Sequence, residues 1–250
     1  MKHLLFILAA AMAFTASAQS LVVAHRGYWK AEGSAQNSCR SLIKADSIGC
    51  WGTEFDVWMS RDGEIFVNHD ETINGIEIQK AKARDVRRQR LPNGEMIPTL
   101  RQLLQVALGT NIELVCELKP HDDKQQEAKA VKKILELFKE YGMEDRVTYI
   151  TFSYPGMKML IQMAPKGTEV YYLNGELSPR DLKALGAAGP DYEYSIFRQH
   201  PEWIQECEKL GLKTNVWTVN KREDLQWCID HDVDYITTNE PELLQYLLKQ

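Results

Sequence analysis

Short apolar runs alternate with longer amphipathic stretches along most of the chain. Runs rich in Val, Ile, Tyr and Phe are typical of buried strands, whereas apolar residues three and four positions apart are typical of helices that pack on one face. We expect strands at 22–24, 53–58, 65–68, 112–117, 147–152, 169–173, 192–196, 213–218 and 235–238. We expect helices at 37–48, 99–108 and 122–141, and further helices that begin near Pro155, Ser178, Pro201, Lys221 and Pro241.

The order of these segments predicts a closed barrel in a single domain. Strands that alternate with helices run parallel and are joined by crossover helices. The chain has 250 residues without a repeat or a low-complexity linker, which suits roughly eight βα units. We therefore expect an α/β fold, the (β/α)8 TIM barrel. The polar and basic segment 71–98 is the longest irregular one, and we expect it to cover the mouth of the barrel.

The N-terminus has the pattern of an export signal. Lys2 and His3 precede an almost wholly apolar run at 4–14, and Ala16-Ser17-Ala18 is a small-x-small ending. The apolar run is too short to span a bilayer. We expect a signal peptide at 1–18 and a mature barrel domain at 19–250, exported to the periplasm or secreted, without a stable membrane anchor.

Composition narrows the classes of partner. Hydrophobic residues make up 44% and charged residues 26% of the chain, which is ordinary for a globular protein and argues against disorder. The net charge of −5 gives no sign of a nucleic-acid partner. The basic residues Arg84, Arg87, Arg88 and Arg90 are interpreted as a solvated face, with contact to an anionic surface as the alternative.

The cysteines give no sign of a zinc site. There are five, an odd number, and none has CxxC spacing. Export would permit a disulfide, with Cys39–Cys50 and Cys207–Cys228 as candidate pairs, whereas Cys116 in a strand is expected to be a small core residue.

Three carboxylates occupy ends of predicted strands. Glu54 and Asp56 are two residues apart and therefore project to the same side of their strand, and Glu117 ends the next barrel strand. A buried carboxylate costs several kcal/mol unless it is paired or binds a metal. Oxygen ligands without thiolates favour Mg²⁺ or Ca²⁺ over zinc. The sequence thus predicts a divalent metal at Glu54, Asp56 and Glu117; the alternative is that Glu54 and Asp56 lie outside the barrel and are solvated.

Two histidines and two cations fall at the same strand ends. His25 and His69 suit general acid/base catalysis because imidazole gives and takes protons near neutral pH. Arg26 and Lys119 add fixed positive charge, which implies an anionic substrate such as a phosphate. The remaining histidines are interpreted as structural or surface groups: His3, His121, His200 and His231.

Aromatic residues near these ends are candidates for a pocket wall. Trp217 closes a strand and either packs in the barrel or contacts a polyol or apolar group of the substrate, with Phe152 and Tyr28 as weaker candidates.

The residues, in this order, resemble the glycerophosphodiester phosphodiesterase family of the phospholipase C-like phosphodiesterase superfamily. The motifs that carry the resemblance are His25-Arg26-Gly27, Asn37, Gly52-x-Glu54-x-Asp56-Val57, Asp62-Gly63, His69-Asp70-Glu71, Ile97-Pro98-Thr99-Leu100, Glu117-Leu118-Lys119, Phe152, Trp217-Thr218-Val219-Asn220 and Ile236-Thr237-Thr238-Asn239-Glu240-Pro241.

The resemblance implies metal-dependent hydrolysis of a small glycerophosphodiester to glycerol 3-phosphate and an alcohol. It implies His25 and His69 as the acid/base pair, and Asn37 joins the substrate-binding candidates Arg26, Lys119, Trp217 and Phe152. Departures from the family pattern are Ala35-Gln36 before Asn37, where Pro-Glu is usual, and Asn239 in place of an Asp. The alternatives are a phospholipase D-like or lyase-type enzyme acting on lipid head groups, and a non-catalytic phosphate-binding barrel.

Overall fold

Eight parallel strands close into a barrel in the computed structural model, which describes residues 19–250. The predicted signal at 1–18 lies outside the described residues. In spatial order the strands are β1 (Leu21–Ala24), β2 (Gly52–Met59), β6 (Glu113–Leu118), β7 (Val147–Thr151), β8 (Val170–Tyr172), β9 (Gly189–Glu193), β10 (Asn215–Trp217) and β11 (Tyr235–Thr238). The barrel closes because β1 pairs with both β11 and β2. The predicted (β/α)8 fold is confirmed.

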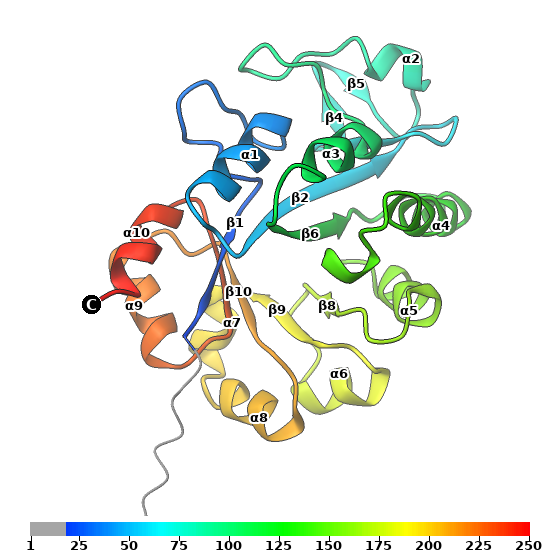
Figure 1. The fold of residues 1–250 in the computed structure, drawn as a ribbon. Coiled ribbons are helices and arrows are strands. Elements are labelled where there is room, and N and C mark those ends of the chain that lie inside the picture. The colour runs from blue at the N-terminus through cyan, green and yellow to red at the C-terminus, as the bar shows by residue number, and fades with distance from the viewer. Residues whose placement is uncertain (1–18) are drawn as a thin grey trace, which may run out of the picture.

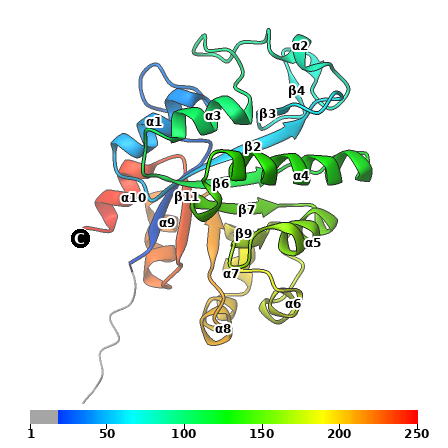
Figure 2. The same ribbon diagram turned by 45° about the vertical axis from the view of Figure 1, so that its right-hand side comes forward.

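Helices surround the barrel (Figures 1 and 2). They are α1 (Cys39–Ser47), α3 (Leu100–Ala107), α4 (Lys124–Glu140), α5 (Tyr154–Met163), α6 (Pro179–Leu185), α7 (Tyr194–Gln199), α8 (Glu202–Leu210), α9 (Arg222–Asp230) and α10 (Pro241–Leu247), with a 3₁₀ turn at Glu144–Arg146. Local sequence fixes their starts: Thr99 and Gln102 form a capping box at α3, which satisfies backbone donors that a helix start leaves free. Within residues 19–250, no helix combines the length and apolar character needed to cross a membrane.

The barrel interior has an apolar layer and a polar layer. The apolar layer consists of Val23, Val115, Ile150, Tyr171, Leu173 and Tyr235. Side chains two positions apart on a strand point the same way. Because Val23 and Val115 point into the barrel, His25 and Glu117, two positions later on the chain, also point inward. They lie nearer the carboxyl ends of the strands. The polar layer, which contains His25 and Glu117, is therefore packed against the apolar layer.

The segment predicted as irregular at 71–98 contains secondary structure and a core of its own. The hairpin strand β3 (Ile65–Val67) pairs antiparallel with β2, and β4 (Thr72–Ile73), β5 (Ile76–Glu77) and α2 (Ala83–Val86) follow it. The apolar residues buried here are Trp58, Phe66, Ile73, Ile78, Val86, Leu91 and Ile97, with Ala35. Most of the segment is irregular, as expected, but two short strands, a short helix and these apolar residues give it a packed core. Figure 1 shows the segment beside the carboxyl end of β2.

The basic residues of this segment lie on an exposed face and several are paired. Arg87 forms an ion pair with Glu64 and Arg84 with Asp85. Arg90 donates a hydrogen bond to the Gly94 carbonyl at 2.6 Å. These contacts agree with the interpretation of a solvated face.

The strand predicted at 192–196 is misplaced. The strand β9 begins at Gly189 and ends at Glu193, whose side chain accepts a hydrogen bond from Ser195 N and caps α7. A Cβ atom at Gly189 would lie 1.8 Å from the Lys213 carbonyl oxygen, so the absent side chain allows this strand to approach its neighbour closely. A Gly-Pro pair is typical of a turn, which explains the error.

All five cysteines are free, and four of them are buried. The candidate disulfides Cys39–Cys50 and Cys207–Cys228 are therefore not formed in the structure. Cys116 is fully buried, as expected for a small core residue.

Candidate active site

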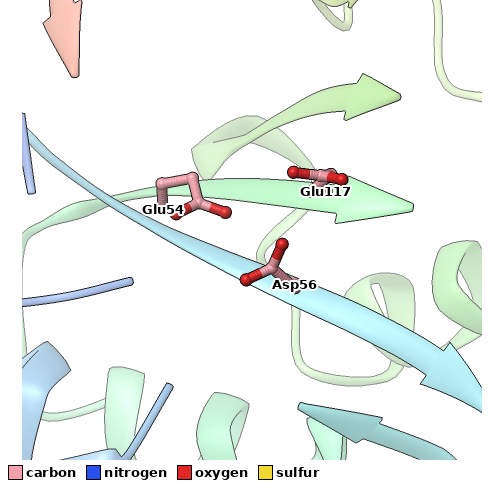
Figure 3. A group of neighbouring side chains, drawn as sticks. All are labelled: Glu54, Asp56 and Glu117. Atoms are coloured by element: carbon pink, nitrogen blue, oxygen red, sulfur yellow. The ribbon is translucent and has the colours of Figure 1, made fainter. Parts of the chain in front are cut away.

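Three carboxyl groups gather at the carboxyl end of the barrel (Figure 3). Glu54 and Asp56 project from β2, and Glu117 projects from the adjacent β6, where it is the register partner of Asp56. One oxygen of each carboxyl lies within 4.8 Å of the other two, and all three side chains are buried. The structure thus brings together the three residues predicted as metal ligands.

This crowding changes the protonation of the carboxyls. Burial, and then the charges of Asp56 and Glu117, raise the pKa of Glu54 well above its usual range. Burial and the Asp56 charge raise the pKa of Glu117 to about 8. Burial opposes ionisation of Asp56, but the Lys119 ammonium and neighbouring donors outweigh it and lower its pKa. Lys119 and Arg26, whose Nε lies 3.9 Å from Asp56 Oδ2, do not offset burial and mutual repulsion at Glu54 and Glu117.

Lys119 bridges two of the carboxyl groups. Its Nζ lies 3.2 Å from Asp56 Oδ1 and 2.7 Å from Glu117 Oε1. Because Lys119 follows Glu117 by two residues, both side chains project to the same face at the end of β6. Glu54 Oε1 remains buried without a hydrogen-bond partner.

The segment after β1 positions the carboxyls of Glu54 and Asp56 through hydrogen bonds from Arg26 and Asn37. Asn37 Nδ2 donates to Asp56 Oδ2 at 2.8 Å, and Asp56 N donates to Asn37 Oδ1 at 3.2 Å. Arg26 N donates to Glu54 Oε2 at 2.7 Å. Arg26 and Asn37 both have left-handed backbones, with φ of 56° and 59°, which turn these groups toward the carboxyls. The amide of Asn37 therefore positions Asp56.

His25 is held as a neutral imidazole. Its Nδ1 lies 2.9 Å from Asn239 Oδ1, an oxygen that also accepts the Trp29 indole N–H at 2.9 Å. Because the indole can only donate, this atom is the amide oxygen and His25 Nδ1 carries the proton. Burial, and then the nearby charge of Arg26, lower the pKa of His25 to about 4. Its unprotonated Nε2 lies 4.0 Å from Glu54 Oε2.

His69 has a more open environment. It follows β3, and the Trp58 indole donates to its carbonyl oxygen at 3.1 Å. Its Nδ1 lies 2.7 Å from Asp70 Oδ1, and 38% of its side chain is exposed. The two histidines thus differ in partner and in burial.

Two cavities adjoin each other beside the carboxyl cluster and the two histidines. The narrower one has a volume of about 100 Å³ and is lined by His25, Arg26, Glu54, His69, Glu117, Ile150, Phe152, Leu173, Asp191, Trp217, Thr218 and Thr237. The wider one has a volume of about 860 Å³ and is lined by Arg26, Trp29, Lys30, Ala31, Ser34, Ala35, Gln36, Asn37, Asn68, His69, Asp70, Leu91 and Pro92. Arg26 and His69 line both cavities. Leu91 and Pro92 are the contribution of the segment 71–98 to the mouth.

Phe152 and Trp217 form the predicted wall of the narrow cavity. Their rings meet edge to face, with centroids 5.6 Å apart. Lys119 Nζ lies 5.9 Å from the centroid of Phe152, and Trp217 Nε1 donates to the Asp191 carbonyl oxygen at 2.9 Å. Tyr28 does not line either cavity, and its hydroxyl donates to Glu242 instead.

Residues 25–243 match the model of the glycerophosphoryl diester phosphodiesterase family. The chain belongs to this family. It is accordingly an enzyme of the phosphoric diester hydrolase class. The matched residues include every member of the group described above.

Relatives of the family resemble the chain along nearly its whole length. A glycerophosphodiester phosphodiesterase of Parabacteroides distasonis has a crystal structure with 44% identity and a TM-score of 0.91, covering 92% of this chain and 97% of its own. One from Caldanaerobacter subterraneus is 27% identical over 250 residues, which is 93% of this chain and 99% of its own. An Oleispira antarctica phosphodiesterase, solved with its product sn-glycerol-3-phosphate, has 22% identity and a TM-score of 0.79 over 93% and 98% of the two chains, and shows the same fold.

The histidines interpreted as structural make contacts of that kind. His121 Nε2 accepts a hydrogen bond from Met59 N at 3.0 Å, and its Nδ1 donates to the Lys119 carbonyl oxygen at 2.8 Å. His200 and His231 stack on tryptophan rings outside the barrel. His3 lies outside the described residues.

Sequence reasoning missed Asp191 and the role of Asn239. Asp191 is 1% exposed on β9 and lines the narrow cavity. Burial, and then the charge of Glu117, raise its pKa well above the usual range. A carboxylate preceded by Gly-Pro resembles a turn residue, so only the correct start of β9 could have placed it inside the barrel.

Proposed function

We propose that the protein hydrolyses glycerophosphodiesters to glycerol 3-phosphate and an alcohol, with His25 and His69 as the acid/base pair. The observation that carries this proposal is the narrow cavity, onto which both imidazoles, Arg26 and two of the three clustered carboxyls open. Family membership and the product bound by the Oleispira antarctica relative support the substrate class.

The carboxyl cluster fits a divalent cation. Glu54 Oε1 is a buried oxygen without a partner, and burial and neighbouring negative charge raise the pKa of Glu54 and of Glu117, which a bound cation would offset. Carboxylate oxygens alone suit Mg²⁺ or Ca²⁺. Glu54, Asp56 and Glu117 would hold the cation, which supplies charge that lowers the pKa of an attacking hydroxyl and offsets charge on phosphoryl oxygens.

The residues of the chain bind the phosphate and move the protons. Arg26 Nε has no hydrogen-bond partner and lies 3.9 Å from Asp56 Oδ2, and the Arg26 side chain borders both cavities, so we expect it to donate to a phosphoryl oxygen. His25 Nε2 carries a lone pair, and His69 lies at the junction of the two cavities. One imidazole takes the proton of the nucleophile while the other protonates the leaving alkoxide.

The two cavities suggest how a diester is divided. The glycerol half fits the narrow cavity against Phe152 and Trp217, where a small polyol packs on aromatic faces. The alcohol half extends into the wide cavity. Arg26 and His69, which border both, then lie beside the scissile phosphate.

The test is turnover of glycerophosphocholine, glycerophosphoethanolamine and glycerophosphoinositol by the purified protein, with and without EDTA treatment. We expect glycerol 3-phosphate from at least one diester, lost with EDTA and restored by Mg²⁺ or Ca²⁺. Accumulation of a cyclic phosphate would favour the lyase-type alternative, and binding without turnover the non-catalytic barrel. For the cellular location we propose export after removal of residues 1–18, which N-terminal sequencing of the mature protein tests.

A further inference from the structure

Asp191 is a buried carboxyl that the proposed mechanism does not use. It projects from β9 into the narrow cavity and is 1% exposed. Its Oδ1 has no hydrogen-bond partner in the protein. Burying such a group without a partner is costly. We therefore expect Asp191 to have a hydrogen-bond partner from outside the chain, such as a bound ligand.

Its position is separate from the carboxyl cluster. Asp191 is not among the three acidic residues whose oxygens lie within 4.8 Å of one another. In the strand order of the barrel, three strands lie between β2 and β9 in one direction, through β6, and three in the other, through β1. Asp191 therefore lies on the opposite side of the narrow cavity from Glu54.

The surroundings of Asp191 favour an uncharged hydrogen-bond donor. Its carboxyl forms no ion pair within residues 19–250, and the charge that acts on it, Glu117, is of the same sign. The Trp217 ring is tied to the Asp191 carbonyl oxygen and forms an apolar wall beside it. Ligand pockets combine apolar and aromatic walls with a few polar groups that fix orientation, so this carboxyl can accept from a hydroxyl while the ring packs against the carbon chain.

We propose that Asp191 accepts a hydrogen bond from the terminal hydroxyl of the glycerol moiety and selects phosphodiesters that carry it. The inference rests on the proposed function, which places the phosphate beside Arg26 and the clustered carboxyls. The glycerol hydroxyl next to the ester then stays close to Arg26 and the clustered carboxyls. The terminal hydroxyl reaches farthest toward β9. Asp191 is thus a specificity residue for the glycerol half.

The experiment compares two substrates. One is glycerophosphocholine, and the other is 2-hydroxypropyl phosphocholine, which lacks only the terminal hydroxyl. The wild type should prefer the first by roughly 10- to 100-fold in kcat/KM, because a lost hydrogen bond to a buried polar group has about that effect. Asp191→Leu should bring the ratio near one by losing activity on glycerophosphocholine. Asp191→Asn, which keeps an acceptor oxygen, should fall in between.

Controls separate this role from others. Asp230→Asn, on an exposed side chain at the end of α9, should leave the ratio unchanged. Thermal unfolding of Asp191→Leu should occur at the same or a higher temperature, since an unpaired buried carboxyl is removed. Calorimetry with Ca²⁺ or Mg²⁺ alone should show unchanged affinity.

Three results would overturn the inference alone: equal cleavage of both diesters by the wild type, an unchanged ratio in Asp191→Leu, or loss of metal affinity in that variant, which would make Asp191 a metal ligand. A large fall in its unfolding temperature would assign a structural role instead. A wild type that cleaves neither diester would overturn the proposed function and the inference with it.

Discussion

Single residues at the carboxyl end of the barrel carry ionisable groups where burial makes charge most costly. The Lys119 ammonium contacts Asp56 and Glu117, and Arg26 Nε lies 3.9 Å from Asp56 Oδ2, whereas Glu54 Oε1 has no hydrogen-bond partner. Such an arrangement is stable only if protons or a cation balance the remaining charge.

Glu54→Gln should weaken binding of Mg²⁺ or Ca²⁺ by more than the roughly 10- to 100-fold that loss of an outer-shell partner costs. The amide keeps the shape of the side chain, so the barrel should still fold. Calorimetry on the purified variant measures the affinity, with Glu136→Gln on the exposed face of α4 as a matched control. Full activity of Glu54→Gln in excess EDTA would contradict the metal proposal.

His25→Ala and His69→Ala should each lower turnover by roughly 10² to 10⁴, the usual scale for losing a positioned acid or base. The double variant should be much less impaired than the product of the single losses, because both groups act in one proton-transfer cycle. Steady-state rates on glycerophosphocholine measure this, and His200→Ala, on a half-buried ring bonded to Glu202, is the control. Multiplicative losses would count against a shared cycle.

At the scale of elements, the packing of β9 against the neighbouring strand depends on Gly189. A Cβ atom at Gly189 would lie 1.8 Å from the Lys213 carbonyl oxygen, so Gly189→Ala has to displace one of the two backbones. We expect a loss of stability of about 1–3 kcal/mol or more in urea denaturation. The kcat/KM should fall as well, because Asp191 lies two residues along the same strand.

Gly109→Ala is the matched control for this change. The added Cβ atom would lie 3.6 Å from the Val106 carbonyl oxygen, an ordinary contact. The control should therefore keep its stability within the range of surface substitutions, about 0.5 kcal/mol. Equal stabilities of the two variants would show that β9 adjusts without cost.

The sequence predicted the elements whose signals are local. The carboxyls at 54, 56 and 117 lie in runs of ordinary strand composition, and the helix cap at Thr99 is a short-range pattern. It misplaced β9 at 192–196 because Gly189 is required there by a close approach to residue 213, which no local pattern encodes. Asp191 was missed for the same reason. The pairing of His25 with Asn239 likewise joins residues 214 positions apart.

For the whole molecule, barrel closure creates a narrow interior cavity, in which we propose that the glycerol half binds. A cavity of about 100 Å³ has no room for acyl chains on the glycerol. We therefore predict faster cleavage of glycerophosphocholine in buffer than of the matching diacyl lipid in vesicles. Trp217→Ala should slow the soluble reaction.

Rates on both substrates, measured with the same protein, test this. Faster cleavage of the lipid, with Trp217→Ala unaltered on the soluble diester, would show that the narrow cavity does not receive the glycerol. The basic segment containing Arg84 to Arg90 would then be the surface to examine for lipid contact.

The unequal volumes of the two cavities, about 100 and 860 Å³, have a consequence for the order of events in turnover. On the proposed division of the diester, the departing alcohol lies in the roomier compartment and escapes first. The phosphorylated product, enclosed by the aromatic wall and held by Arg26, leaves last. Release of glycerol 3-phosphate, the product common to all substrates, would then be the rate-limiting step. Diesters with different head groups would therefore have similar maximal rates.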